Sequence, residues 1–344
     1  MKRGILLVAY GSGNLRGTTA LRAVQAAAEA RFRLPVRWAF TSETMRIRLA
    51  RSRTKSDSVL KALSRMRFER YTHVAVQTLH LIPGDEYTGV AEDCRAAMGD
   101  GFHVSLGQPM LSGEGPEHPS IRVAAETLLR HISPLRTPEE PVICMAHGSR
   151  HECDILFRRW EQAVHDLDPL VHVTCMISPD TPRGIPLDEV PDGLDIFLPE
   201  LTAQLPESRR VWLLPLLSLV GRHTLEDMAG ASPESWKSRI EAAGGCCQAE
   251  LRGLADDPAF VSLWLDRLEE ALATFEPPAG EAAPAEDAAP AEDTEDAEAR
   301  GTADAQALPG AHALPRRILE KPSSAPREPL PQSADAHLSS DTSA

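Results

Sequence analysis

The sequence predicts an α/β protein built from a duplicated unit whose parallel sheets are covered by helices. Short apolar runs of strand length alternate with helical patterns from residue 4 to residue 275. Such alternation is typical of parallel sheets with helices on their faces. The order of segments in the first half recurs in the second half, which favours two similar α/β domains with a cleft between them.

The first half contains four predicted strands, each followed by a helical pattern. The strands are residues 4–9, 36–40, 71–79 and 104–106, and the helices are residues 18–30, 43–55, 58–66, 87–98 and 121–132. The first strand ends in Tyr10-Gly-Ser-Gly13, a glycine-rich turn that could cradle a phosphate on helix amides. Its spacing fits neither the dinucleotide-binding fingerprint nor the P-loop, so a nucleotide site is weakly supported.

The second half repeats this order after a Pro-rich linker at residues 133–141. Its strands are residues 142–146, 171–176, 211–217 and 248–251, and its helical segments are residues 153–167, 195–205, 233–243 and 258–275. We therefore predict domains at residues 1–135 and 136–276. Residues 277–344 hold 13 acidic and 5 basic residues and almost no large apolar ones, which predicts a disordered tail.

Charge and hydropathy exclude several classes of function. The net charge of −14 argues against general nucleic-acid binding. No apolar run approaches the ~20 residues that span a membrane, and the apolar run after Met1-Lys2-Arg3 is too short for a signal peptide. We therefore expect a cytoplasmic protein. None of the six cysteines forms a C-x-x-C pair, so a zinc ribbon is not expected, and Cys144 and Cys175 fit small core residues.

Three side chains at matched strand ends form the candidate site. His147 follows the strand at residues 142–146, while Glu86 and His223 lie at corresponding distances beyond the strands at 71–79 and 211–217. A lone histidine in such a turn is more often structural. Two imidazoles and a carboxylate together suit a divalent metal, and neutral imidazoles can also act as bases near pH 7. His80 and His151 are expected to orient these groups.

A basic block in the first half has two interpretations. Residues 43–55 form a helical stretch that contains Arg46, Arg48, Arg51, Arg53 and Lys55. Such a stretch is either a solvated helix face or a set of counter-charges for a polycarboxylate or phosphate ligand.

Three strings resemble those of the anaerobic cobalt chelatases of the CbiK type, which are class II tetrapyrrole chelatases. The strings are His80-Leu-Ile-Pro-Gly-Asp-Glu-Tyr87, Ala146-His147-Gly148-Ser149, and His223 followed by Asp227-Met-Ala-Gly230 and Ser235-Trp-Lys237. The resemblance covers about residues 3–270. It departs from the family at Tyr10-Gly-Ser-Gly13, where Phe-Gly-Thr-Ser is common, and at Arg222 and Glu226, where Asp and Asn are usual.

The resemblance implies two Rossmann-like domains related by a pseudo-twofold axis, and insertion of Co²⁺ into sirohydrochlorin on the route to cobalamin. It places the metal on His147, His223 and Glu86, with His147 as proton acceptor. It implies no cofactor beyond the metal substrate and no ATP, with Fe²⁺ or Ni²⁺ as alternative metals in vitro. The partners are then sirohydrochlorin and the metal, and a homo-oligomer is compatible. Candidate substrate-binding residues are Tyr10, Ser12, Arg16, Arg46, Arg53, His80 and Ser149. The alternatives are a sirohydrochlorin ferrochelatase for sirohaem and a non-catalytic tetrapyrrole or metal carrier.

Overall fold

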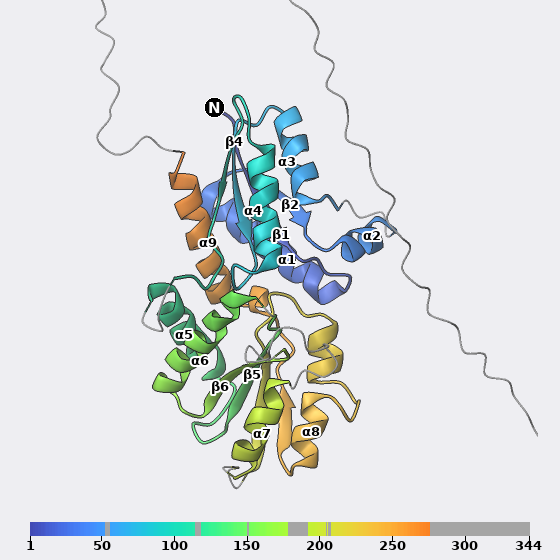
Figure 1. Ribbon diagram of the computed structural model, residues 1–344, viewed down its shortest axis with the longest axis vertical. Helices are drawn as coiled ribbons and strands as arrows, with labels where there is room; N and C mark the ends of the chain where they lie inside the picture. Colours follow the sequence, from blue (N-terminus) through green and yellow to red (C-terminus); the bar gives the residue numbers. More distant parts are fainter. Residues whose placement is uncertain are drawn as a thin grey trace, which may run out of the picture. The chain divides into compact units, whose positions relative to one another are not determined.

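The computed structural model contains two parallel four-stranded sheets, each covered by helices on both faces (Figure 1). It describes residues 1–51, 56–113, 118–149, 151–177, 192–203, 205 and 208–275. The predicted α/β class and the repeated order of elements are confirmed. Both sheets have the same strand order, β2-β1-β3-β4 in the first and β6-β5-β7-β8 in the second.

The first sheet contains strands β1 (Arg3–Ala9), β2 (Val36–Phe40), β3 (His73–Thr78) and β4 (His103–Leu106). Alternate residues of β1 face opposite sides, so Ile5 and Leu7 pack on one face while Leu6 and Val8 pack on the other. The first face is covered by α1 (Leu15–Phe32), and the second by α3 (Val59–Phe68) and α4 (Asp85–Ala97). A short helix, α2 (Glu43–Arg51), follows β2.

The second sheet repeats this layering. It contains β5 (Val142–Ala146), β6 (Val171–Cys175), β7 (Arg210–Pro215) and β8 (Cys246–Ala249). One face packs against α5 (Pro119–Ile132) and α6 (Ile155–Leu167), and the other against α7 (Gly193–Ala203) and α8 (Trp236–Ala242). In both sheets the first strand in the chain lies between the second and the third, so the strand order reverses direction there. Parallel sheets bind ligands at such switch points, beyond the carboxyl ends of the strands.

Two helices pack against elements of the other half. The last helix, α9 (Pro258–Ala273), lies against β3 and β4 of the first sheet, beside which Figure 1 shows it in orange. Helix α5 precedes β5 in the chain and packs against α6. The apolar face of each helix therefore packs against residues on the other side of the linker. The domain boundaries at residues 135 and 276 stay a prediction.

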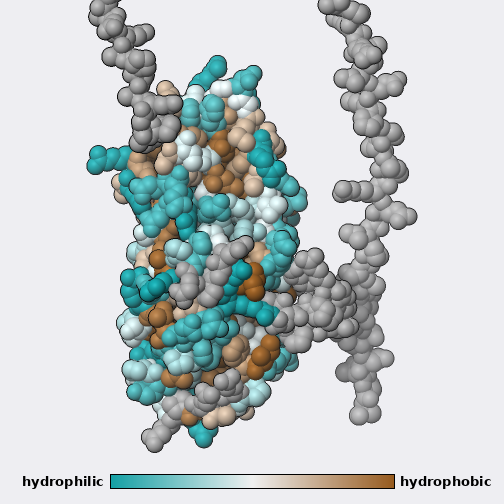
Figure 2. Space-filling model, turned by 60° about the vertical axis from the view of Figure 1, so that its left-hand side comes forward, coloured by the Kyte–Doolittle hydropathy of each residue, from teal (hydrophilic) through white to brown (hydrophobic). Residues whose placement is uncertain are grey.

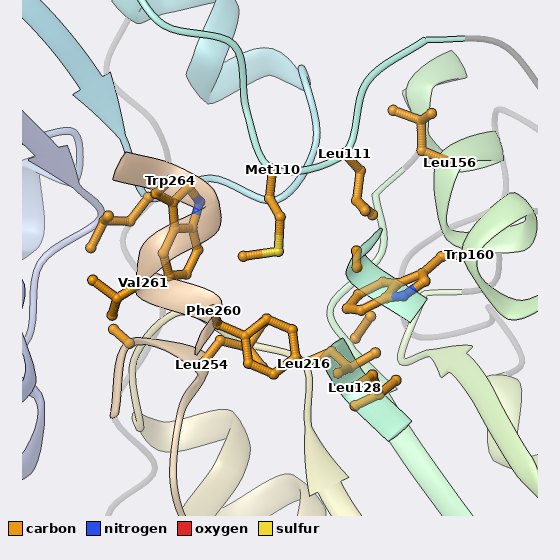
Figure 3. Packing of buried hydrophobic residues seen from close by; sticks show 14 of the residues in the cluster. Met110, Leu111, Leu128, Leu156, Trp160, Leu216, Leu254, Phe260, Val261 and Trp264 are labelled. Atoms are coloured by element: carbon orange, nitrogen blue, oxygen red, sulfur yellow. The ribbon is translucent and has the colours of Figure 1, made fainter. Parts of the chain in front are cut away.

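One hydrophobic cluster joins the two halves. It contains residues of β1, α1 and β3 together with residues of α5, β5, α6, β7 and α9. Figure 3 shows Trp264 and Phe260 of α9 beside Met110 and Leu111, with Trp160 of α6 on the other side. All five side chains are at most 1% exposed. The described residues of the two halves accordingly form one compact unit.

Predicted and observed element bounds differ mainly at helix ends. Helix α1 begins three residues early because Asn14 caps it, its Oδ1 accepting a hydrogen bond of 2.8 Å from Gly17 N. Helix α4 begins at Asp85 rather than at residue 87, which places Glu86 in its first turn. Strand β8 lies at residues 246–249 rather than 248–251, paired with β7 through Val211 and Cys247. The predicted tail lies outside the described residues.

None of the described helices is long and apolar enough to cross a membrane. On the face shown in Figure 2, hydrophilic residues cover most of the surface, and hydrophobic residues occur in separate small patches.

Candidate metal and substrate site

His147 lies directly beyond β5, at the switch point of the second sheet. Its backbone is fixed by the segment just beyond β6, since Ile177 N donates to His147 O over 3.0 Å. Its side chain is exposed. Its Nδ1 lies 2.6 Å from Gly148 O. A carbonyl oxygen only accepts hydrogen bonds, so Nδ1 carries a proton, and the neutral ring has its lone pair on Nε2 for a ligand.

His223 begins a single π-helical turn, His223–Met228, beyond β7. Its Nδ1 lies 2.6 Å from Asp227 Oδ2. A carboxylate also accepts only, so Nδ1 of His223 carries a proton, and the neutral ring has its lone pair on Nε2. Strands β5 and β7 pair directly, with Met145 opposite Pro215, which brings the two turns to one edge of the sheet. The imidazole centroids lie 4.8 Å apart with their planes at 80°.

A buried carboxylate stabilises the turn that carries His147. Asp154 is 2% exposed, and its two oxygens accept from Ser149 N over 2.7 Å and Ser149 Oγ over 2.9 Å. Burial raises the pKa of Asp154, and the two bonds from Ser149 oppose that rise. Gly148 has a φ of +71°, and a Cβ there would lie 2.2 Å from Ile177 O. The turn therefore requires glycine beside the histidine.

The loop that leads to His223 is attached to the first half of the chain. Asn14 Nδ2, in the turn after β1, donates to Val220 O over 2.8 Å. Ser218 Oγ donates to Leu79 O, just beyond β3. These contacts hold the loop that precedes His223 against the carboxyl ends of β1 and β3.

Glu86 occupies a position in the first half that corresponds to His223 in the second. It lies eight residues beyond Thr78, the end of β3, as His223 lies eight residues beyond Pro215, the end of β7. Its carboxylate is engaged within the first half, with Oε2 at 2.9 Å from His80 Nε2 and at 3.3 Å from Thr41 Oγ1. The His80 contact is at ion-pair distance, although neither buried ring nitrogen makes a well-angled hydrogen bond.

The structure thus brings together His147 and His223, while Glu86 pairs with His80. No group of three or more His, Cys, Asp or Glu side chains able to hold a metal occurs among the described residues. The start of α4 nevertheless lies beside the turn that follows His147. Asp85 Oδ1 is 3.8 Å from His151 Nε2, and a Cβ at Gly84 would lie 3.6 Å from Cys153 Sγ.

The candidate substrate-binding residues are in varied environments. Tyr10 is 53% exposed at the end of β1, whereas Ser12 is buried and its Oγ accepts from Asn14 N over 3.3 Å. Arg16 is exposed and reaches Leu251 O over 3.4 Å. Arg46 directs Nη1 to Phe40 O and Thr41 O, at 2.7 and 2.6 Å, so this guanidinium braces the end of β2.

Two remaining candidates complete this set. Ser149 is committed to Asp154 through both its amide and its hydroxyl. Arg53 lies outside the described residues, as does Lys55 of the same basic block.

The cysteines do not contribute ligands to this site. Cys144 and Cys175 are buried in β5 and β6, as predicted, and burial raises the pKa of both thiols. Burial also raises the pKa of Cys153 to about 12. Cys246 is exposed and Cys247 buried at the start of β8, so the two thiols point to opposite sides of the strand.

Sequence reasoning missed the residues that hold these groups in place. Asp227 was recognised only as part of a motif, although its spacing of four residues from His223 is the signal of a helical contact. Asp154 and Asn14 gave no signal, because their partners depend on the tertiary fold.

A family model described as cobalt chelatase (CbiK) matches residues 3–273. The chain belongs to the CbiK family of cobalt chelatases. The predicted resemblance is therefore confirmed, and the two histidines lie in a metal-chelatase fold.

Curated CbiK-type relatives match over most of their own length. The sirohydrochlorin cobaltochelatase CbiKC of Nitratidesulfovibrio vulgaris is 47% identical over 278 residues, which are 80% of this chain and 92% of the relative. The sirohydrochlorin cobaltochelatase of Salmonella typhimurium is 28% identical over 276 residues, 79% of this chain and 97% of the relative.

A solved structure has the same fold. SirB from Bacillus subtilis with Fe³⁺ superposes with a TM-score of 0.56 at 14% identity, covering 80% of this chain and 98% of SirB. The cobalt complex of the B. subtilis subspecies spizizenii chelatase gives a TM-score of 0.52 at 14% identity, covering 80% and 97%. At this identity the likeness shows the fold alone.

Proposed function

We propose that this CbiK-family chelatase inserts Co²⁺ into sirohydrochlorin and that His147 and His223 hold the incoming ion. One observation carries the site: two imidazoles 4.8 Å apart both have Nδ1 committed to an oxygen acceptor. Both neutral rings therefore have Nε2 available for a ligand. The match to the cobaltochelatase of N. vulgaris supports the choice of metal and tetrapyrrole.

A site with a small number of protein ligands suits a metal ion that must be transferred to the substrate. Imidazole nitrogens bind divalent first-row metals, and open positions let water and then the macrocycle nitrogens replace them. His147 and His223 are exposed and half-exposed, respectively, so a macrocycle can approach their Nε2 atoms.

Metal insertion releases two pyrrole protons, and the site contains two groups that can take them. Sirohydrochlorin loses its two N–H protons as two Co–N bonds replace two N–H bonds. His147 Nε2 accepts one proton once the metal has left it, and the Glu86 carboxylate accepts the other. Glu86 is 45% exposed in its side chain and is held by Thr41 and His80. In this scheme Glu86 joins the two histidines only when metal and substrate are present.

The macrocycle is expected to bind between the two halves. Exposed apolar side chains occur on elements around the site: Tyr10 after β1, Leu15 at the start of α1, and Leu225 in the π-helical turn. Arg16 and the basic residues that follow β2 supply counter-charges for the substrate carboxylates. We expect no requirement for ATP. Cytoplasmic location and a homo-oligomer stay predictions.

Catalytic turnover tests this proposal. Purified protein, sirohydrochlorin and Co²⁺ are mixed without ATP, and insertion is followed through the change in the macrocycle absorption spectrum. We expect many turnovers for the wild type and a loss of about 10²-fold or more in kcat/KM for His147→Ala and His223→Ala. A matched control is His165→Ala, which removes an exposed imidazole on α6.

The possible results separate the alternatives. A spectral change that stops at one equivalent of protein would indicate a tetrapyrrole or metal carrier instead of an enzyme. Faster turnover with Fe²⁺ than with Co²⁺ at equal free concentrations would indicate a ferrochelatase. Full activity in His147→Ala would overturn the site assignment.

A further inference from the structure

The two imidazoles of the site differ in the oxygen that each Nδ1 contacts. His147 donates to a neutral peptide carbonyl, Gly148 O, whereas His223 donates to a carboxylate, Asp227 Oδ2, over 2.6 Å in both cases. A charged acceptor makes a stronger hydrogen bond and raises the basicity of the opposite ring nitrogen more than a neutral one does. The two Nε2 atoms are therefore unequal as metal ligands.

The π-helical turn creates the His223–Asp227 pair. Its wider winding appears in the bond from Ala229 N to Thr224 O, 3.2 Å across five residues. Within that turn, residues four apart lie almost above one another, so the short Asp227 side chain reaches the ring of His223. Thr224 and Met228 are fully buried, which anchors the turn. Single π-helical turns often occur at functional sites.

We propose that Asp227 is a positioning residue that makes His223 the ligand which retains the metal, while His147 is the ligand which releases it. The inference rests on the proposed function for its account of metal transfer. Asp227 fixes the His223 tautomer and ring orientation and strengthens the donation of Nε2. His147 gives up the ion first, and its freed Nε2 is then available for a pyrrole proton.

The charges around this pair fit that role. Arg222 Nε binds Glu226 Oε2 at 3.0 Å, while its Nη2 is 4.0 Å from Asp227 Oδ1. The arginine therefore pairs mainly with Glu226 and leaves Asp227 Oδ2 to the imidazole. Glu226 is a carboxylate of the same turn that pairs with Arg222 and with no histidine of the described residues, so it offers a matched control.

Co²⁺ binding to the full chain, measured by calorimetry without tetrapyrrole, tests the inference. We expect Asp227→Asn and Asp227→Ala to weaken Co²⁺ binding about 10–100-fold. Glu226→Gln should bind like the wild type. The effect of Asp227→Asn should persist in a His147→Ala background and disappear in a His223→Ala background, because it acts through His223 alone.

A second measurement reads the imidazole directly. In ¹⁵N NMR spectra of the metal-free protein, His223 should carry its proton on Nδ1, and Asp227→Ala should give a mixture of tautomers. Wild-type Co²⁺ affinity in Asp227→Asn, an equal effect in both histidine backgrounds, or an unchanged His223 tautomer in Asp227→Ala would overturn the inference. Neither measurement requires turnover. A wild type that inserts no metal would therefore contradict the proposed function, while the binding and NMR results would still decide the role of Asp227.

Discussion

At the scale of the residue, one proton position on each imidazole decides what the site can bind. His147 and His223 were predicted from sequence because each follows a strand end in a duplicated pattern. Their Nδ1 partners were not predictable, because Gly148 O and Asp227 Oδ2 are selected by local backbone geometry. The pairing of Glu86 with His80 was likewise invisible, since two residues six apart meet only through the bend between β3 and α4.

In the proposed mechanism Glu86 acts mainly in proton removal, which predicts a separation of binding from turnover. In Glu86→Gln the amide can still contact Thr41 and His80 but accepts no proton. We expect Co²⁺ affinity within about threefold of wild type and kcat lower by about 10²-fold or more. Calorimetry and the insertion assay together measure the two quantities.

The neighbouring residue provides the control for this experiment. Asp85 is 89% exposed in its side chain, and the ion pair that it makes among the described residues is with His151, at 3.8 Å, so Asp85→Asn should retain turnover. A loss of Co²⁺ affinity in Glu86→Gln as large as that in His223→Ala would instead make Glu86 a metal ligand of equal weight.

At the scale of the element, the turn after β5 depends on one glycine. Gly148 has a φ of +71°, and a Cβ would meet the backbone at Ile177 O. An Ala there costs about 1–2 kcal/mol for the left-handed backbone alone. We expect Gly148→Ala to displace His147 and to lower both Co²⁺ affinity and turnover at least tenfold, while circular dichroism still shows the folded α/β protein.

Gly89 is the matched control, since it lies exposed in α4 and a Cβ there would meet nothing within 4 Å. Gly89→Ala should leave turnover intact and add about 0.5–1 kcal/mol of stability. Equal activity in Gly148→Ala and Gly89→Ala would show that the turn tolerates a side chain beside His147.

The opposite end of the first sheet contains a pH-sensitive contact. His73 stacks on His103 with centroids 4.7 Å apart, and Phe275 beyond α9 meets its edge at 5.0 Å. Burial lowers the pKa of His73 below its ordinary value of 6.5, with smaller contributions from His103, Arg3 and the N-terminus. The unfolded chain therefore takes up this proton at a higher pH than the folded protein does.

Stability linked to His73 is thus present above about pH 6.5 and is lost as the pH falls through the folded-state pKa. We expect the free energy of unfolding, measured with urea, to fall between about pH 7.5 and about pH 5.5, and to fall less in His73→Gln. An identical pH dependence in the two proteins would contradict this assignment.

At the scale of the whole molecule, the two halves depend on one another. The strand–helix alternation was readable because buried parallel strands are short apolar runs bounded by turn residues. The placement of α9 on the first sheet was not readable, because an amphipathic helix does not specify which complementary face it covers. The sequence likewise could not indicate that the loop before His223 is tied to Asn14 and Leu79.

The fully buried Trp264 of α9 tests that dependence. Its indole packs in the shared cluster, and its Nε1 donates to His80 O over 3.2 Å. We expect Trp264→Ala to lower the free energy of unfolding by about 3–5 kcal/mol.

Ending the chain after residue 276 should leave stability and turnover unchanged, because the family match ends at residue 273. A large loss of activity on this truncation would assign a function to the tail.

The most direct test of the metal site is X-ray absorption at the cobalt K-edge of the Co²⁺-loaded protein, which counts imidazole ligands. Two imidazoles are predicted for the wild type, one for His147→Ala and one for His223→Ala. An unchanged pattern of two imidazoles in both single variants would place the metal elsewhere and contradict the account.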